Sequence, residues 1–278
     1  MNYIKSIIRI LITSVLLIFT IQISYAQISP SLNIISGFSI PAAELTGDLI
    51  TSNDSGYSFI NPAFVRDNYA NSTGVLISGN LKIPIEKSGI VNLLFSGSYS
   101  FFNVFRRTAL GTTIRNNIVI PASYSSRFSV STFGLGMEIM PLPNAKFSPF
   151  INSNFTFNIL SLSLAENEFI NAIFSDAFRM GVLSSAGMYI KLNHEYSLVL
   201  GCSYHLSNLL LRSNEGSLNE SVVFGRDNNS INDEEGVFYT NLSSTETFPQ
   251  QVNGKRKNAN WWNINIGINI VLGKSVKK

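Results

Sequence analysis

Hydrophobic and polar residues alternate with a period of two along most of this chain. The clearest stretch covers residues 262–272, where Trp262 and every second residue after it are apolar, while Asn263, Asn265 and Asn269 lie between them. On a helix these apolar side chains would spread around the circumference, whereas on a strand they share one face. The pattern therefore predicts a β-strand with one apolar and one polar face.

Seven earlier segments show the same alternation, so we expect eight strands. The segments cover residues 32–40, 75–85, 91–101, 133–139, 151–159, 178–192, 196–206 and 262–272. The alternation is interrupted at Ser36 and over residues 127–132, where a β-bulge would be no surprise. The polar face is mostly Ser, Gly and Asn. These small residues suit the crowded interior of an eight-stranded barrel better than the solvated face of a secreted β-sandwich.

The connections between these segments alternate strictly between short and long. Short turns cover residues 86–89, 141–146 and 193–195, and long connections cover about residues 41–68, 104–123, 160–176 and 211–258. If successive strands run antiparallel, all short turns lie at one end and all long loops at the other. This arrangement is typical of outer-membrane barrels, which have short periplasmic turns and long extracellular loops. The predicted fold class is an all-β, eight-stranded antiparallel transmembrane β-barrel.

The first 26 residues are typical of a secretory signal peptide. Lys5 and Arg9 precede an apolar run at residues 10–21, and the small-x-small pattern ends at Ala26. The run is short for a membrane-spanning helix, which needs about 20 residues. The expected organisation is a signal peptide at residues 1–26 and a barrel domain at residues 27–278, located in the bacterial outer membrane.

Composition supports this class and excludes others. Only 13% of the 278 residues are charged and 45% are hydrophobic, whereas a soluble domain carries about 25% charged residues. With Cys202 as the only cysteine and two histidines in all, a disulfide scaffold and a zinc site of paired cysteines are excluded. No cofactor or metal is expected. Removal of Lys5 and Arg9 with the signal leaves 18 Lys and Arg against 17 Asp and Glu, so no basic patch suggests nucleic acid.

The eight amphipathic segments, with the runs Gly37-Phe38-Ser39-Ile40-Pro41 and Gly134-Leu135-Gly136-Met137-Glu138, resemble the small outer-membrane β-barrel superfamily. That group includes the opacity-protein, OmpX and OmpA-barrel types. The resemblance implies fold far more than function. It also implies outer-membrane lipid, lipopolysaccharide and the barrel assembly machinery as partners. The chain departs from many such barrels because residues 273–278 end without an aromatic residue.

Two sets of residues are the candidates for a role inside and around the barrel. A polar network in the lumen is expected from Lys82, Glu138, Arg179, Lys191 and His205. The charges would either form ion pairs that plug the barrel or line a gated path, and the narrow bore of eight strands favours the plug. Aromatic residues near strand ends are expected at the membrane interfaces. The interface set is Tyr99, Phe101, Tyr196, Tyr204, Trp261 and Trp262, with Tyr69 and Phe147 as further examples.

The run Tyr204-His205-Leu206-Ser207-Asn208 is the sharpest local signal for chemistry. His205 and Ser207 share one strand face, and Glu215 or Glu220 could complete a triad for acyl transfer. The run resembles one in the outer-membrane lipid A 3-O-deacylase. The alternation, however, turns His205 and Ser207 inward, so a hydrogen-bonding role in the lumen is the default.

Two charged segments follow in the longest connection. Residues 227–235 gather oxygen ligands that could suit calcium, but they fail the EF-hand pattern, so a solvated acidic loop is favoured. Lys255, Arg256 and Lys257 either meet anionic lipopolysaccharide or form a solvated rim.

The expected function is that of a non-enzymatic outer-membrane barrel that presents extracellular loops for surface contact or envelope integrity, with an unknown extracellular ligand. One alternative is a narrow path for small solutes or hydrophobic molecules, as in OmpW-like barrels. The other is a lipid A-modifying hydrolase that uses His205 and Ser207.

Overall fold

The computed structural model describes residues 29–52, 54–61, 63–64, 66–105, 109–115, 118–167, 170–213, 229–240 and 250–273. The predicted signal peptide lies outside the described residues. In chain order the elements are β1 (Ser31–Ala42), the 3₁₀ helix η1 (Ala43–Leu45), β2 (Ile50–Ser52), β3 (Ser58–Ile60), β4 (Gly74–Pro84), β5 (Val91–Phe101), β6 (Ala109–Arg115), β7 (Ile118–Ile139), β8 (Phe147–Glu166), β9 (Ile170–Ser175), β10 (Ala177–Lys191), β11 (Tyr196–Leu210), β12 (Asn229–Ser230), β13 (Gly236–Thr240), β14 (Gln250–Gly254) and β15 (Asn260–Val271). Over the described ranges, no helix has the length and apolarity needed to cross a membrane.

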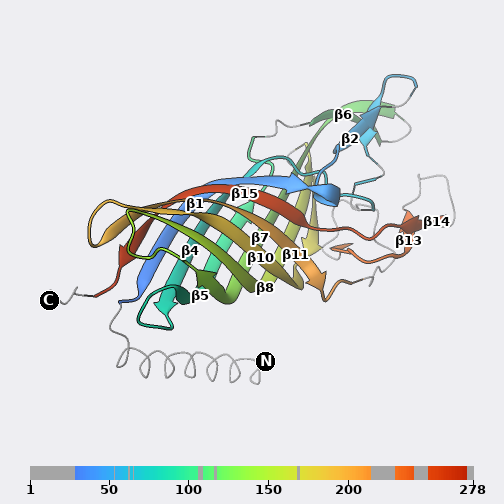
Figure 1. Ribbon diagram of the computed structural model, residues 1–278. Helices are drawn as coiled ribbons and strands as arrows, with labels where there is room; N and C mark the ends of the chain where they lie inside the picture. Colours follow the sequence, from blue (N-terminus) through green and yellow to red (C-terminus); the bar gives the residue numbers. More distant parts are fainter. Residues whose placement is uncertain are drawn as a thin grey trace, which may run out of the picture.

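Eight of these strands form a closed antiparallel barrel, as the alternation predicts (Figure 1). Neighbouring strands follow the order β1, β4, β5, β7, β8, β10, β11 and β15. The ring closes because β15 pairs with β1 along its whole length, from Ser31 opposite Val271 to Ala42 opposite Asn260. Closure leaves these eight strands without a free edge within the membrane, where unpaired backbone groups would be costly.

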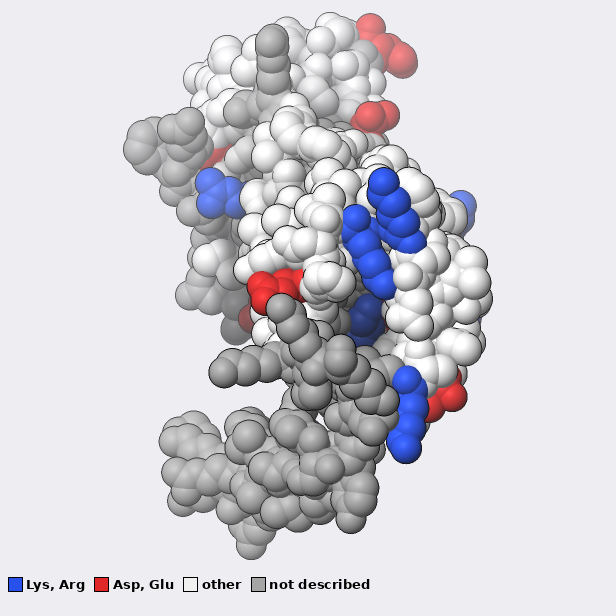
Figure 2. Space-filling model, turned by 60° about the vertical axis from the view of Figure 1, so that its left-hand side comes forward, with Lys and Arg blue, Asp and Glu red and all other residues white. Residues whose placement is uncertain are grey.

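The two faces of the barrel wall differ sharply in polarity. Outward-facing side chains are large and apolar, and Ile77 and Phe133 are 61% and 68% exposed. The face of the molecule drawn in Figure 2 is mostly uncharged, and Lys, Arg, Asp and Glu cover only a small part of it. The inward face carries buried Asn, Ser and Thr. A closed wall that is apolar outside and polar inside belongs in lipid, and this architecture places the protein in the bacterial outer membrane.

Strands β7 and β8 are much longer than a membrane crossing requires. They have 22 and 20 residues, whereas about 9–11 residues span a bilayer. In β8 the apolar residues from Ile151 to Ile159 point outward, and from Leu160 onward they point inward. We call this switch of the apolar residues from the outer to the inner face the inversion. In β7 it separates outward-facing Phe133 from inward-facing Val130 and Phe128. The inversion marks the level at which both strands leave the lipid.

This inversion also explains the interrupted alternation at residues 127–132. Over residues 127–132 the pairing of β7 with β8 is continuous, and its pairing with β5 is continuous from Ser129 onward. The pairing of β1 is continuous through Ser36, so the bulges suggested for these two strands are wrong. Among the described barrel pairings, the register shifts between Met180 and Val182 on β10. There, two steps along β10 face four steps along β11, from Leu206 to Leu210.

Much of the predicted long connections is regular β-structure rather than loop. Residues 104–123 contain β6 and the start of β7, and residues 160–176 contain the end of β8 and β9. We call β2, β3, β6 and β9, together with β7 before Ser131 and β8 after Ile159, the extracellular arm. From Ser131 to Ile118, β7 extends 13 residues, or about 43 Å at 3.3 Å per residue. Figure 1 shows β2 and β6 at the end of this projection.

A compact apolar core fills the barrel where the arm begins. Its centre is aromatic: the Phe102 ring lies 5.5 Å from Trp261 and 5.9 Å from Phe128, and Tyr69 lies 5.3 Å from Phe128. Around this centre pack Leu45, Leu49, Phe64, Ala70, Ala122, Tyr124, Val130, Leu160, Leu162, Leu164, Phe174, Ala177, Ile231 and Ala259. We call this set the mouth core. It joins the ends of the barrel strands to the first and the last long connection.

Candidate functional site in the barrel lumen and mouth

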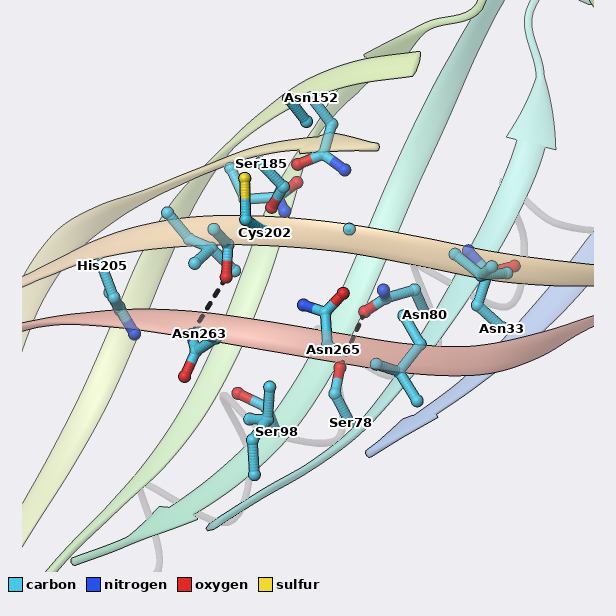
Figure 3. Close-up of a pocket in the computed structure, with 18 of the residues that line it drawn as sticks. Asn33, Ser78, Asn80, Ser98, Asn152, Ser185, Cys202, His205, Asn263 and Asn265 are labelled. Carbon is cyan, nitrogen blue, oxygen red and sulfur yellow. Dashed lines mark hydrogen bonds between the residues drawn. The ribbon is translucent and has the colours of Figure 1, made fainter. Parts of the chain in front are cut away.

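The middle of the barrel holds a chamber with an uncharged lining. Amide and hydroxyl side chains such as Asn80, Asn152 and Asn265 point into it (Figure 3). They leave a free volume of about 40 Å³ between them. Asn263 Nδ2 donates to Ser203 Oγ at 3.0 Å, which ties β15 to β11. We call this space the central chamber.

A buried ion pair lies on the short-turn side of the chamber. Lys82 Nζ on β4 lies 3.2 Å from Glu138 Oε1 on β7, and both side chains are buried. The Tyr189 hydroxyl donates to Glu138 Oε2 at 2.9 Å and accepts from Asn33 Nδ2 at 2.9 Å. Lys82 Nζ also lies 4.0 Å from the centre of the Tyr189 ring, which adds a cation–π contact. Four strands are thereby tied together across the lumen, and we call this group the periplasmic lock.

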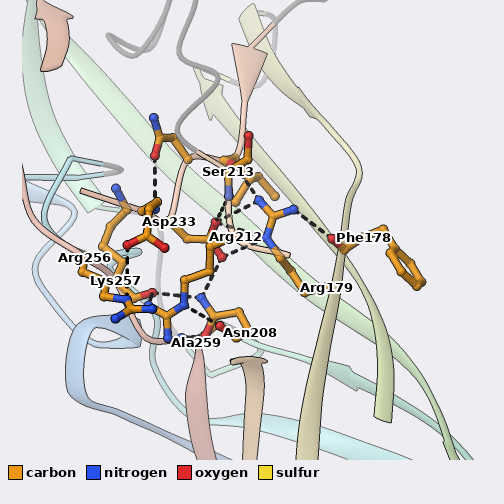
Figure 4. Close-up of polar contacts among 12 residues, drawn as sticks. Phe178, Arg179, Asn208, Arg212, Ser213, Asp233, Arg256, Lys257 and Ala259 are labelled. Carbon is orange, nitrogen blue, oxygen red and sulfur yellow. Dashed lines mark hydrogen bonds and ion pairs between the residues drawn. The ribbon is translucent and has the colours of Figure 1, made fainter. Parts of the chain in front are cut away.

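On the opposite side, Arg179 holds a carboxylate from the longest connection (Figure 4). Arg179 Nε and Nη2 each donate to Asp233 at 2.9 Å, in the two-pronged geometry that suits a guanidinium and a carboxylate. Asn208 Nδ2 donates to the same carboxylate at 2.7 Å, and the Ser213 backbone N–H donates at 3.0 Å. The Asp233 charge is therefore fully compensated although the side chain is buried.

Asp233 belongs to a short buried segment that we call the mouth plug, consisting of Ile231, Asn232 and Asp233. All three residues are buried, and Ile231 packs into the mouth core. The backbone oxygen of Ile231 accepts from Arg179 Nη2 at 3.0 Å. The plug thus combines apolar packing with a buried ion pair at the barrel mouth.

A second polar layer covers the plug. Arg212 Nη2 donates to Asn258 Oδ1 at 2.7 Å, and Asn258 Nδ2 donates to Glu44 Oε2 at 3.0 Å. Lys257 is buried, and its ammonium donates to the backbone oxygen of Arg66 at 3.0 Å. The first and last long connections are therefore linked to each other as well as to the barrel.

The structure does not assemble a serine–histidine pair. His205 and Ser207 both point inward, as the alternation predicts, and both are buried. The Ser207 hydroxyl donates to the backbone oxygen of Ala259 at 2.6 Å. The His205 ring lies 3.3 Å from the Thr156 hydroxyl and 4.2 Å from the centre of the Trp261 ring. Glu215 and Glu220 lie outside the described residues. His205 and Ser207 therefore act as packing and hydrogen-bonding groups of the lumen.

The remaining charged residues that the sequence suggested lie at different places in the structure and do not form one network. Arg179 lies at the mouth rather than beside Lys82 and Glu138. Lys191 lies half-buried at the end of β10. Lys255 and Arg256 are exposed, and Arg256 forms an exposed ion pair with Glu234 at 3.3 Å. Since Lys257 is buried, the three basic residues do not form one patch.

The suggested calcium cluster is not assembled in the described part of residues 227–235. Its Asp233 is committed to Arg179, and the described chain contains no group of three His, Cys, Asp or Glu residues that could hold a metal. Asp227 and Asn228 lie outside the described residues.

All but two of the aromatic residues expected at the membrane interfaces lie on the outer wall of the barrel. Tyr99, Phe101, Tyr196, Phe147 and Trp262 are exposed on the outer wall, and the Tyr204 ring packs 4.5 Å from Trp262. The predictions for Trp261 and Tyr69 are wrong, because both are fully buried in the mouth core. Trp261 precedes Trp262 on a strand, and strict alternation already requires the two rings to point to opposite faces.

Sequence reasoning missed three residues that build the site. Tyr189 completes the periplasmic lock, Asp233 carries the plug, and Asn208 supports it. Asn208 follows inward-facing Ser207 directly, and both can face inward only because the register of β11 shifts beside Met180. No sequence pattern predicts this shift of register.

The closed wall, the apolar outer belt and the polar interior define this chain as a small outer-membrane β-barrel protein. No protein-family model matches the chain, and no curated protein matches its sequence. Three solved structures are similar in overall shape, each at 10% sequence identity. Neisserial surface protein A (NspA) has a TM-score of 0.40, with 87% of this chain and 96% of that chain covered. A major outer membrane protein from Thermus thermophilus has 0.40, with 88% and 100% covered. The outer membrane protein OprG from Pseudomonas aeruginosa has 0.39, with 90% and 100% covered.

Proposed function

We propose that this protein is a non-enzymatic, non-conducting outer-membrane barrel that carries a folded extracellular arm for contact with other surfaces. The observation that supports the proposal is the packing at the barrel mouth, where the mouth core and the Arg179–Asp233 pair occupy the lumen and join the long connections. A barrel that only displayed flexible loops would not need an apolar core outside the membrane. The core makes the arm a rigid extension of the barrel.

The lumen supports the non-conducting part of this proposal. An ion that crosses the barrel would have to pass the buried Lys82–Glu138 pair and then the mouth plug, and eight strands leave only enough width for side chains. We therefore expect planar lipid bilayers that contain the purified protein to show no conductance steps above the empty bilayer. Regular steps would refute this part.

One feature favours a narrow solute path as the second candidate. The carbonyl oxygens of Asn152 and Asn154 are buried in the central chamber and have no hydrogen-bond partner in the described part of the chain. Such acceptors suit water or a small neutral solute that donates hydrogen bonds. Swelling of liposomes loaded with a large sugar and placed in glycerol or urea tests this candidate, and swelling no faster than in protein-free liposomes rejects it.

The surface-contact part can be tested by shortening the arm. Replacing residues 106–123 with a short Gly/Ser linker removes β6 and the tip of β7 while leaving the membrane-spanning strands intact. Cells with this variant should attach less well to surfaces and to each other than cells with the full chain. Lys87→Ser, which alters a periplasmic turn, is the matched control and should attach normally.

The same strains distinguish surface contact from envelope integrity. Under our proposal, loss of the protein lowers attachment and leaves detergent resistance unchanged. If loss of the protein sensitises cells to detergent, and the shortened variant restores resistance completely, the barrel serves the envelope and the arm is not its functional part.

A further inference from the structure

Two apolar residues after β5 fold back onto the outside of the barrel. Phe102 points into the mouth core, but the Val104 and Phe105 side chains are 42% and 61% exposed. The Phe105 ring lies 6.1 Å, centre to centre, from the ring of Phe38 on β1. Since β4 lies between β5 and β1, the chain must reach past β4 to make this contact.

Asn103 holds the turn that directs this segment outward. Its backbone has a φ of 65°, a left-handed conformation that Asn tolerates better than most residues. Its side chain accepts from the Ser72 backbone N–H at 2.7 Å and donates to the Ser126 backbone oxygen at 3.1 Å and to Asn71 Oδ1 at 2.8 Å. Three hydrogen bonds of the Asn103 side chain therefore determine the direction of the chain at this point.

The depth of the contact lies within the lipid-facing belt. On β1, Phe38 is opposite Ile264 of β15, and Ile40, one row nearer the mouth, is opposite Trp262. Ile40 and Trp262 are both exposed on the outer wall. The Phe38 ring therefore lies one row deeper in the membrane than Trp262, and Phe105 reaches that ring.

We propose that Val104 and Phe105 form a lipid wedge that inserts into the outer leaflet and anchors the base of the extracellular arm. The wedge is continuous with the apolar wall through Phe38, so acyl chains that cover the wall also cover the wedge. If they were exposed to water, these side chains would lose the favourable free energy of burying their apolar surface. Because β6 begins at Ala109, the wedge sits directly before the arm and limits its movement relative to the membrane.

The only cysteine of the chain offers an internal reference for a test. Cys202 is exposed on the outer wall of β11, so a nitroxide attached there reports lipid. In a Cys202→Ser background, Phe105→Cys places the label on the wedge, and Leu110→Cys places it on β6, where the side chain is 77% exposed. Electron paramagnetic resonance then compares the access of oxygen, which concentrates in lipid, with that of a water-soluble nickel chelate.

We expect the label at position 105 to match the label at Cys202, with high oxygen and low nickel access, and the label at position 110 to favour nickel. A label at position 105 that behaves like the one at position 110 would overturn the proposal. A label shielded from both reagents would also overturn it, because another protein surface would then cover the patch. If Phe105→Cys does not reach the folded gel mobility, Val104→Cys carries the same test. The outcome does not depend on whether the barrel conducts.

Discussion

Asp233→Asn should release the mouth plug from the barrel far more often than in the wild type. Asp233 and Arg179 are paired at 2.9 Å, with side-chain exposures of 1% and 6%. The amide has the size of the carboxylate but no charge, so the buried guanidinium would lose its counter-ion. Breaking a buried ion pair from one side costs about 3–5 kcal/mol.

This cost falls on the docked plug, because in the released state the Arg179 side chain gains access to water. At about 1.4 kcal/mol for each factor of ten, it raises the ratio of released to docked plug between about 140-fold and 3,700-fold. The neighbouring Glu234 provides a matched control. Its pair with Arg256 is exposed, and exposed pairs contribute at most about 1 kcal/mol. Glu234→Gln should therefore change the ratio by about fivefold or less.

The ratio of released to docked plug can be measured as the labelling rate of a cysteine that is buried in the docked plug. Ile231 is 3% exposed within the plug, so in a Cys202→Ser background Ile231→Cys should react slowly with a water-soluble maleimide. If the plug opens and closes faster than the reagent reacts, the labelling rate follows the released fraction. A less than tenfold increase on adding Asp233→Asn, or an equal increase with Glu234→Gln, would show that Arg179 does not hold the plug in place.

Further predictions concern the periplasmic lock, the mouth core and the hydrolase hypothesis. Lys82→Met should destabilise the barrel by about 3–5 kcal/mol because it leaves the buried Glu138 charge unpaired, and adding Glu138→Gln should restore part of the loss of heat-resistant gel mobility. Trp261→Ala should cost about 3–5 kcal/mol by emptying the mouth core, whereas Trp262→Ala on the lipid side should cost clearly less in the same assay. Ser207→Ala should leave the lipid A mass spectrum of expressing cells unchanged, because its hydroxyl serves a backbone carbonyl; an altered spectrum would revive the hydrolase hypothesis.

The strands and the direction of their side chains could be predicted because both depend on local sequence. Period-two alternation is a property of neighbouring residues, so it placed Lys82, Glu138, Arg179 and His205 inside before any pairing was known. The same rule would have placed Trp261 inside, had the general preference of tryptophan for membrane interfaces not been given more weight.

The partners of these residues could not be predicted, because they depend on distant contacts. Arg179 and Asp233 are separated by 54 positions, and Asp233 lies in a connection without periodicity. A sequence of Asn, Asp and Glu is equally compatible with a solvated loop and with a single buried carboxylate. Only the position of the connection over the mouth decides which residue meets Arg179.

The inversion of apolar phase in β7 and β8 connects the sequence to the position of the membrane. Below the inversion, Phe155, Phe157 and Ile159 point to lipid while Asn158 faces the lumen. Above it, the same strand turns Leu160 inward and Ser161 outward, because water surrounds the wall and apolar groups must be buried within it. A bulge would have produced the same break in pattern by shifting the register, yet the β7–β8 pairing continues without a shift from Ile139 to Tyr124. A break in alternation is therefore a register defect when pairing changes and a change of solvent when it does not, and in this barrel it marks where the lipid-facing wall ends and the self-supporting arm begins.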